Sequence, residues 1–180
     1  MTVDIAFSLN QTLREPLLVV INSILSNVSE PTEAAPGALR FNVVVPPGDR
    51  TLFQESFNAA FAPAIDSGKA IFRIEEFIPP NYLKEYLDEK FQAKTPMRKL
   101  SRYMQYGRLF LSDLFPDVGR VVYLDCDTLV LGDVRSLYAQ GEKLTAGRYL
   151  AAVPHFLPAA LNFSNPFKII SDLRQLESTF

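Results

Sequence analysis

The chain has 180 residues, of which 48% are hydrophobic and 21% charged, so it can fold as one domain around a buried core. Eighteen lysines and arginines against twenty aspartates and glutamates give a net charge of −2, which argues against a nucleic acid as the partner. The single cysteine, Cys126, and the single histidine, His155, argue against a disulfide and against a thiolate or histidine-rich metal site. The longest apolar runs are far shorter than the roughly 18 residues of a membrane helix, so we expect no membrane segment in this chain.

Apolar, β-branched runs alternate with segments of helical periodicity as far as about residue 155. This alternation is typical of an α/β protein with a mainly parallel sheet. The segment 26–37, rich in proline, glutamate and alanine, is expected to be a surface loop. In the first half of the chain the pattern predicts strands over 3–7, 39–45 and 70–74, a helix that begins near Pro16, and a helix over 51–61 that ends before Pro63.

In the second half the pattern predicts helices over 82–91 and 100–115, the longer one capped by Ser101. The segment 121–124 is apolar on both faces, as expected of a central parallel strand. No shift in composition marks a domain boundary, so we expect a single domain over 1–180. Shorter elements are predicted to follow: strands over 128–131 and 150–153, and a helical turn over 134–138.

The predicted strand at 121–124 ends in an Asp-x-Asp motif, Asp125-Cys126-Asp127. Ligands of open parallel sheets bind beyond the carboxyl ends of the strands. Side chains two positions apart on an extended chain project to the same side, so both carboxylates can contact one cation. Magnesium and manganese prefer such oxygen ligands and commonly complete their shell with phosphates and water. The motif therefore predicts a divalent metal site for a diphosphate ligand.

The alternative is that the two aspartates cap a turn. The apolar runs on both sides of the motif, Val-Val-Tyr-Leu before it and Thr-Leu-Val-Leu after it, favour the metal site. Neighbouring carboxylates in apolar surroundings are costly unless a cation neutralises them.

The stretch 108–138, RLFLSDLFPDVGRVVYLDCDTLVLGDVRSLY, resembles the core of glycosyltransferase family 8. The segment 5–8, IAFS, resembles the first strand of that family, and 20–25, VINSIL, resembles its first helix. The segment 161–166, LNFSNP, is similar to part of the plant galacturonosyltransferases within the family. The resemblance implies a Rossmann-like, nucleotide-sugar-binding GT-A fold. It also implies a UDP-sugar donor, a carbohydrate or other hydroxyl acceptor, and hexosyl transfer that retains the anomeric configuration.

The resemblance implies functional roles for Asp125, Asp127 and Arg108. Asp125 and Asp127 would bind the Mn²⁺ or Mg²⁺ ion that bridges the donor diphosphate, with Asp125 also near the ribose. Arg108 would be the basic residue beside the diphosphate, where a guanidinium stabilises the charge of a leaving phosphate. Without the resemblance, Arg108 is better explained as a surface arginine that pairs with Asp113 or Asp117.

The loop after the first strand differs from the family pattern. The family has an acidic residue and often a tyrosine there to hold the nucleobase, whereas this chain has Ser-Leu-Asn-Gln-Thr over 8–12. Asn10 can still hydrogen-bond a uracil. We therefore assign Asn10, with Arg108 and Asp125, to the binding of the nucleotide.

The later half of the family pattern is missing from the chain. Neither the Asn-Ser-Gly or Asn-Ala-Gly acceptor motif nor the closing His-x-x-Gly-x-x-Lys motif, whose histidine is a third metal ligand, is present. His155 has neither that context nor that place in the order, so we interpret it as a loop histidine. The chain is therefore expected to be a C-terminally truncated domain of the family, in the Golgi if it is a eukaryotic galacturonosyltransferase-like protein and cytoplasmic otherwise.

Two other functions remain open at this point. One is a nucleotide-binding remnant without catalytic activity. The other is a phosphatase similar to the haloacid dehalogenases, in which the first aspartate is the phosphoryl nucleophile and the second the general acid. Those motifs usually follow the first strand and continue with Gly-Thr, whereas Thr128 follows Asp127 directly here.

Overall fold

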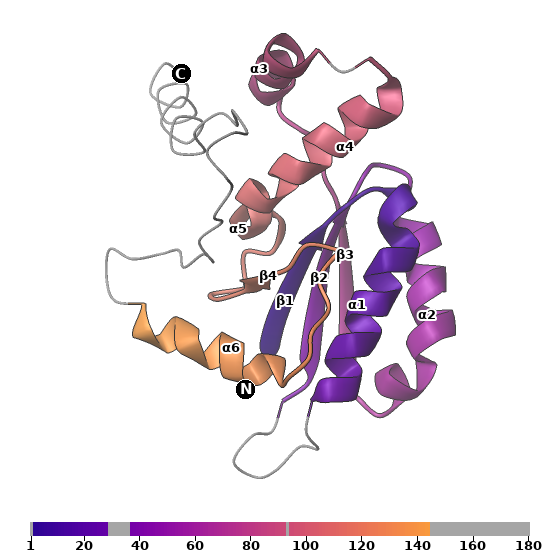
Figure 1. Cartoon of the computed structure of the whole chain (residues 1–180), viewed down its shortest axis with the longest axis vertical. Coiled ribbons are helices and arrows are strands. Elements are labelled where there is room, and N and C mark those ends of the chain that lie inside the picture. The colour runs from indigo at the N-terminus through magenta and orange to yellow at the C-terminus, as the bar shows by residue number, and fades with distance from the viewer. Residues whose placement is uncertain (1, 29–36, 93, 145–180) are drawn as a thin grey trace, which may run out of the picture. The chain divides into compact units, whose positions relative to one another are not determined.

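The computed structural model describes residues 2–28, 37–92 and 94–144. Strands and helices alternate along these residues, as the sequence predicts (Figure 1). In chain order they are β1 (Val3–Ser8), η1 (Gln11–Leu13), α1 (Arg14–Asn27), β2 (Leu39–Val45), α2 (Arg50–Asp66), β3 (Ala70–Glu76), α3 (Asn81–Phe91), α4 (Pro96–Gly107), η2 (Arg108–Phe110), α5 (Leu111–Leu114), β4 (Val122–Tyr123), α6 (Val134–Gln140) and η3 (Gly141–Lys143).

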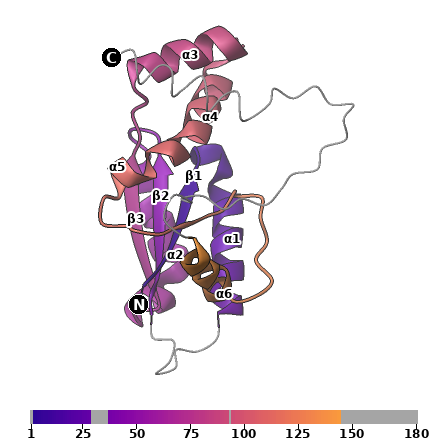
Figure 2. The same ribbon diagram turned by 90° about the vertical axis from the view of Figure 1, so that its left-hand side faces the viewer.

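The four strands form one sheet in the order β3-β2-β1-β4, and every pair of neighbours is parallel. The chain runs from β1 through β2 to β3 on one side of β1, and then returns to place β4 on the other side. Helices α1 and α2 lie against one face of the sheet, and α4 crosses near the carboxyl ends of the strands (Figures 1 and 2). The predicted α/β class with a mainly parallel sheet is confirmed.

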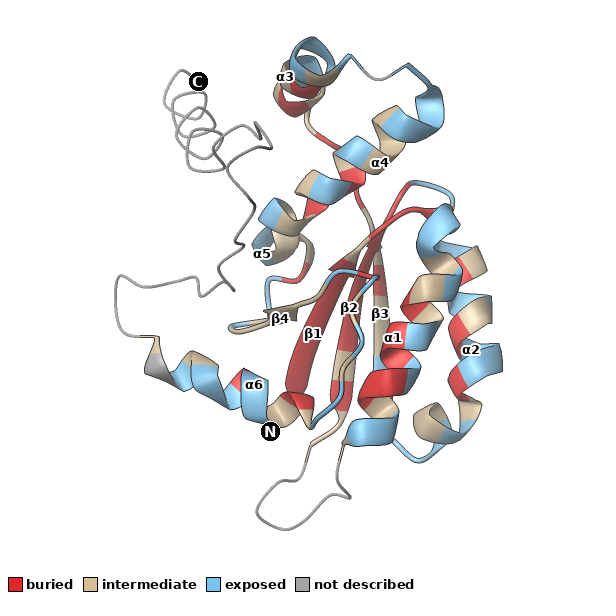
Figure 3. Ribbon diagram, in the orientation of Figure 1, coloured by how far each residue is buried: buried red, intermediate tan, exposed pale blue. Residues whose placement is uncertain are grey.

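The face of the sheet that α1 and α2 cover is apolar. Successive residues of a strand point to opposite faces, and Ile5, Phe7 and Phe41 on this face are all 0% exposed. Phe57 of α2 stacks on Phe72 of β3 with ring centroids 4.5 Å apart. Both β1 and β2 are buried along most of their length (Figure 3). This core fixes the two central strands from which the functional residues extend.

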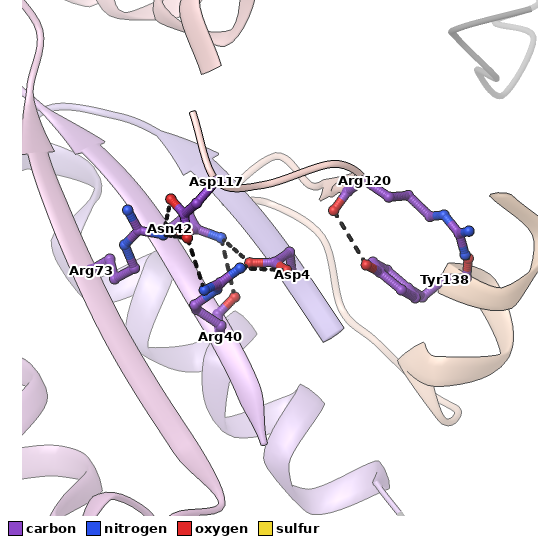
Figure 4. Close-up of polar contacts among 7 residues, drawn as sticks. All are labelled: Asp4, Arg40, Asn42, Arg73, Asp117, Arg120 and Tyr138. Atoms are coloured by element: carbon purple, nitrogen blue, oxygen red, sulfur yellow. Dashed lines mark hydrogen bonds and ion pairs between the residues drawn. The ribbon is translucent and has the colours of Figure 1, made fainter. Parts of the chain in front are cut away.

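The opposite face of the sheet carries a network of charged side chains (Figure 4). Asp4 is only 4% exposed. Arg40 donates to both of its carboxylate oxygens, at 2.5 and 3.0 Å, and the Asn42 amide nitrogen donates to one of them at 2.8 Å. Arg40 and Arg73 also bind Asp117, at 3.1 and 2.8 Å. Because Asp117 lies on the loop that leads into β4, the network fastens that loop to β2 and β3.

A second contact joins the same loop to α6. The Tyr138 hydroxyl donates to the backbone oxygen of Arg120 at 3.4 Å, and the Arg120 guanidinium lies over the Tyr138 ring, 5.1 Å from its centre (Figure 4). The loop before β4 is therefore held from both the sheet and α6.

Three predicted helix boundaries are wrong. The helix predicted over 100–115 does not continue to 115, because α4 ends at Gly107 and η2 separates it from α5. Helix α2 continues to Asp66, and Pro63 kinks it instead of ending it: Phe61 has non-helical angles (φ −127°, ψ 20°), because proline lacks an N–H and clashes with the preceding turn. Helix α4 begins at Pro96, with the Thr95 hydroxyl accepting from the Arg98 N–H at 3.3 Å. Ser101 therefore lies inside α4 and does not cap it.

The predicted strand at 121–124 is present but short. β4 spans Val122–Tyr123, is half-buried, and pairs with β1. Among the described strands it lies at the edge of the sheet, so the expectation of a central strand buried on both faces is wrong for this part of the chain. The segment 128–131 is not a strand, whereas the predicted helical turn at 134–138 is present within α6.

Several predictions concern residues outside those that the structure describes. They are the strand over 150–153, the segment 161–166 and the loop histidine His155, together with most of the loop predicted over 26–37. In the described residues, no helix is both long and apolar enough to cross a membrane.

Candidate functional site

The strand order reverses between β1 and β4, and this is where ligands of open parallel sheets bind, beyond the carboxyl ends of the strands. In the register of the two strands, Ala6 pairs with Tyr123, and the Leu124 N–H donates to the Ala6 oxygen at 3.1 Å. The chain therefore leaves β1 at Ser8 and β4 at Asp125 side by side. The predicted Asp-x-Asp motif follows β4 at this edge of the sheet.

The motif forms a turn, not the extended segment from which its geometry was predicted. The Thr128 N–H donates to the backbone oxygen of Asp125 at 3.1 Å. Cys126 is 8% exposed and belongs to the hydrophobic core, while Asp125 and Asp127 on either side of it are exposed. The buried thiol thus anchors the turn, and both carboxylates face solvent.

Burial also determines the chemistry of Cys126. Burial, together with the neighbouring carboxylates of Asp125 and Asp127, raises the pKa of the thiol to about 12. A thiol of this kind stays protonated at neutral pH and is a poor nucleophile. Cys126 is therefore a packing residue.

The two carboxylates provide the oxygen ligands that a divalent cation prefers. In residues 2–28, 37–92 and 94–144, no group of three or more histidine, cysteine, aspartate or glutamate side chains could hold a metal ion. Two carboxylates suit a cation such as Mg²⁺, which commonly takes one or two of them and completes its coordination with substrate phosphates and water. That Asp125 and Asp127 hold such a cation stays a prediction.

Arg108 lies beside the first aspartate of the motif. Its Nη2 donates to Asp125 Oδ1 at 3.2 Å, and its Nε donates to the Gln105 backbone oxygen at 2.8 Å. The guanidinium also lies over the Tyr123 ring, 4.5 Å from its centre. Asp117, a predicted alternative partner, binds Arg40 and Arg73 instead. Three contacts hold the Arg108 cation at the edge where a diphosphate would meet Asp125.

Gly107 allows α4 to bring Arg108 to this position, and sequence reasoning missed it. A Cβ at Gly107 would lie 2.5 Å from the Ser8 hydroxyl oxygen and 3.3 Å from side-chain atoms of Phe77 and Val44. The absence of a side chain is therefore needed where the last turn of α4 meets the ends of β1 and β2. The sequence signal for this contact is the position of Gly107 directly before Arg108, the arginine that the family resemblance had singled out.

Asn10 follows β1 and is 1% exposed. Its Nδ2 donates to the Ser101 hydroxyl at 2.6 Å, and its Oδ1 accepts from the Thr12 N–H at 3.0 Å. In this structure Asn10 caps η1 and links the loop after β1 to α4. Its contact with a nucleobase stays a prediction.

A family model described as glycosyl transferase family 8 matches residues 4–175. The chain belongs to glycosyl transferase family 8. This membership confirms the predicted family, and it replaces the phosphatase interpretation of Asp125 and Asp127.

Two similar proteins were found, one by sequence and one by structure. Probable galacturonosyltransferase-like 3 of Arabidopsis thaliana is 35% identical over 71 residues, which are 39% of this chain and 19% of the relative. The crystal structure of mouse xyloside xylosyltransferase 1 in its apo form matches with a TM-score of 0.56 at 15% identity, over 82% of this chain and 51% of that chain. The structural match confirms the predicted GT-A type of fold. The matches cover about half of the solved structure and a fifth of the plant relative.

Proposed function

We propose that the chain acts in a retaining hexosyltransferase that uses a UDP-sugar donor and a carbohydrate or other hydroxyl acceptor. The observation that carries the proposal is the Asp125-Cys126-Asp127 turn, which presents two exposed carboxylates beside Arg108 where the strand order reverses. Family membership supports glycosyl transfer as the type of reaction.

In this proposal Asp125 and Asp127 hold a Mn²⁺ or Mg²⁺ ion through their carboxylate oxygens, and the nucleoside diphosphate supplies further ligands. Once bound, the cation neutralises the diphosphate and makes it a better leaving group. Arg108 exchanges part of its contact with Asp125 for a phosphate oxygen, because both lie at the same edge of the sheet. The exposure of both side chains, 38% for Arg108 and 58% for Asp125, leaves room for this exchange.

The transfer breaks the bond between the anomeric carbon and the phosphate oxygen, and the bonding electrons leave with the diphosphate. Arg108 stabilises the negative charge that develops there. The acceptor hydroxyl forms its new bond on the face from which the diphosphate departs, and its proton passes to the departing phosphate or to solvent. None of the described side chains is assigned as a nucleophile.

Calorimetric titration of UDP into the chain, with and without Mn²⁺, tests the donor site. We expect binding that depends on Mn²⁺ in the wild type and disappears in Asp127→Ala. Glu55→Ala removes an exposed carboxylate on α2, remote from the motif, and should bind as the wild type does. Unchanged binding by Asp127→Ala would remove the assignment of the metal site.

Turnover separates an enzyme from a nucleotide-binding remnant. A panel of UDP-sugars with Mn²⁺ should release UDP in the presence of a suitable acceptor, and even slow hydrolysis of one donor identifies the sugar. Binding of UDP without release of UDP from any donor would favour the remnant instead.

A further inference from the structure

Positive charge is concentrated in one segment of this weakly acidic chain. Residues 94–108 contain five lysines and arginines and no aspartate or glutamate, although the whole chain has a net charge of −2. Most of this segment is α4, whose buried positions are Met104 and Gly107. The basic side chains therefore lie on the outer side of the helix.

Several of these side chains line a cavity of about 420 Å³ between the end of α3 and α4. Three of the lining residues are cationic and three are neutral hydrogen-bonding residues: Lys94, Arg98, Arg102, Gln92, Ser101 and Gln105. Such a lining suits an anionic ligand that also carries hydroxyl groups. The cavity has about the size of one or two sugar rings, too small for a nucleic acid duplex.

The cations of this cavity are not neutralised by carboxylates in the described part of the chain. Asp88, the acidic residue packed against α4, binds Lys99 and the Tyr103 hydroxyl. Arg102 donates to Gln105 Oε1 at 3.1 Å and lies over the Phe91 ring, 4.6 Å from its centre. These contacts orient the Arg102 guanidinium but leave its charge available to a ligand.

The cavity adjoins the proposed donor site through two hydrogen bonds. Ser101, which lines the cavity, accepts from Asn10 at 2.6 Å. Gln105, which also lines it, accepts the Arg108 Nε at 2.8 Å through its backbone oxygen. Gln105 lies about one turn before Arg108, whereas Arg102 and Arg98 lie about 9 and 15 Å from it along the helix axis. A saccharide of two or three rings held by these arginines can therefore extend along α4 toward Arg108.

We propose that this cavity binds an acidic acceptor saccharide through a carboxylate or phosphate group held by Arg98, Arg102 and Lys94. The assignment to the acceptor rests on the proposed glycosyl transfer. The anion site itself rests only on the cavity and its charge. Arginine recognises planar carboxylates and phosphates with paired hydrogen bonds, and Ser101 and Gln105 can bind the hydroxyl groups of the same sugar.

Titration of the full chain with a trigalacturonate, and with a neutral trisaccharide of the same length, tests the proposal. We expect the trigalacturonate to bind, to bind more weakly as NaCl increases, and to lose at least about tenfold in affinity in Arg98→Glu. Lys69→Glu makes the same change of charge just before β3 and should bind as the wild type does. Arg98→Lys keeps the charge but loses the paired hydrogen bonds, so its affinity should lie between those of the wild type and Arg98→Glu.

Further arms identify the anion and separate the two proposals. If glucose 6-phosphate competes more strongly than glucuronate, the site prefers phosphate, and the reverse assigns it to a carboxylate. Binding of UDP with Mn²⁺, measured on the same preparations, should be unchanged in Arg98→Glu. If the wild type does not bind UDP in the presence of Mn²⁺, only the proposed donor site is refuted. Equal binding of the neutral trisaccharide, unchanged affinity in Arg98→Glu, or tighter binding of a DNA oligomer or an anionic vesicle would overturn the acceptor site.

Discussion

Replacing Gly107 by alanine tests whether the close contact of α4 with the sheet positions Arg108. An added Cβ would lie 2.5 Å from Ser8 Oγ and 3.3 Å from both Phe77 and Val44. The Ser8 hydroxyl already donates to the Met104 backbone oxygen, so moving it aside breaks that hydrogen bond. The substitution therefore adds volume to a contact that has no space for it.

The expected change in the free energy of unfolding of Gly107→Ala is the sum of one stabilising and two destabilising contributions. Alanine is favoured over glycine inside a helix by about 1 kcal/mol. The lost hydrogen bond costs about 1 kcal/mol, and overpacking costs about 1–3 kcal/mol more. The sum predicts that Gly107→Ala lowers the free energy of unfolding by about 1–3 kcal/mol. For a chain of this size, that lowers the melting temperature by about 2–4 °C per kcal/mol.

Urea denaturation followed by circular dichroism measures this cost, and Gly119→Ala is the matched control. Gly119 is exposed, and a Cβ there would have no neighbour within 4 Å, so its substitution should be neutral. The double variant Ser8→Ala/Gly107→Ala removes the nearest contact and should recover part of the lost stability. We also expect Gly107→Ala to lower kcat for UDP-sugar turnover more than it changes the affinity for UDP, because the displaced residue directly precedes Arg108. A Gly107→Ala protein as stable as the wild type would refute the close-contact argument.

Two further predictions concern charged residues. Arg108→Gln should lower kcat for UDP-sugar turnover by about 10²–10³ and change the affinity for UDP with Mn²⁺ much less, because it removes stabilisation of the charge that develops beside Asp125; an unchanged kcat would contradict its role. The hydrogen bond from Arg73, with the charge of Arg40, lowers the pKa of Asp117 below its ordinary 3.8. Its ion pairs therefore stabilise the fold above about pH 4 and are lost as the pH falls through the lowered pKa. Asp117→Asn should consequently unfold at a lower urea concentration than the wild type at about pH 7, and this difference should shrink toward about pH 3. A difference that does not change with pH would refute the stabilising role of these ion pairs.

The strands were the most predictable elements because the signal for each is local. β1, β2 and β3 are apolar, largely β-branched or aromatic runs bounded by polar or proline-containing segments, and each was placed within two residues of its observed ends. The helix boundaries at Pro63 and Ser101 were less predictable. Ser101 looked like a cap, but it bonds Asn10, which is 91 residues away in the sequence. Contacts of that kind have no local signal.

The partner of Arg108 shows the same limit in the candidate site. Local spacing alone favoured Asp113 or Asp117 as the partner of Arg108, and only the family resemblance assigned Arg108 and Asp125 to the same nucleotide ligand. Asp117 is instead bound by arginines of β2 and β3, which lie 77 and 44 residues from it. The turn at Cys126 was only the alternative prediction for a different reason, since an Asp-x-Asp triplet is compatible with both extended and turn backbones.

The shortness of β4 explains why so many contacts surround it. Two paired residues provide little sheet hydrogen bonding, so the pairing alone would leave the Asp-x-Asp turn loosely placed. The strand is instead fixed at both ends, by the ion pairs of Asp117 before it and by the buried Cys126 after it. Between these anchors, Tyr123 supports the Arg108 guanidinium. A strand held in this way can end early, and its early end is what exposes Asp125 and Asp127 beside β1 where a charged ligand can reach them.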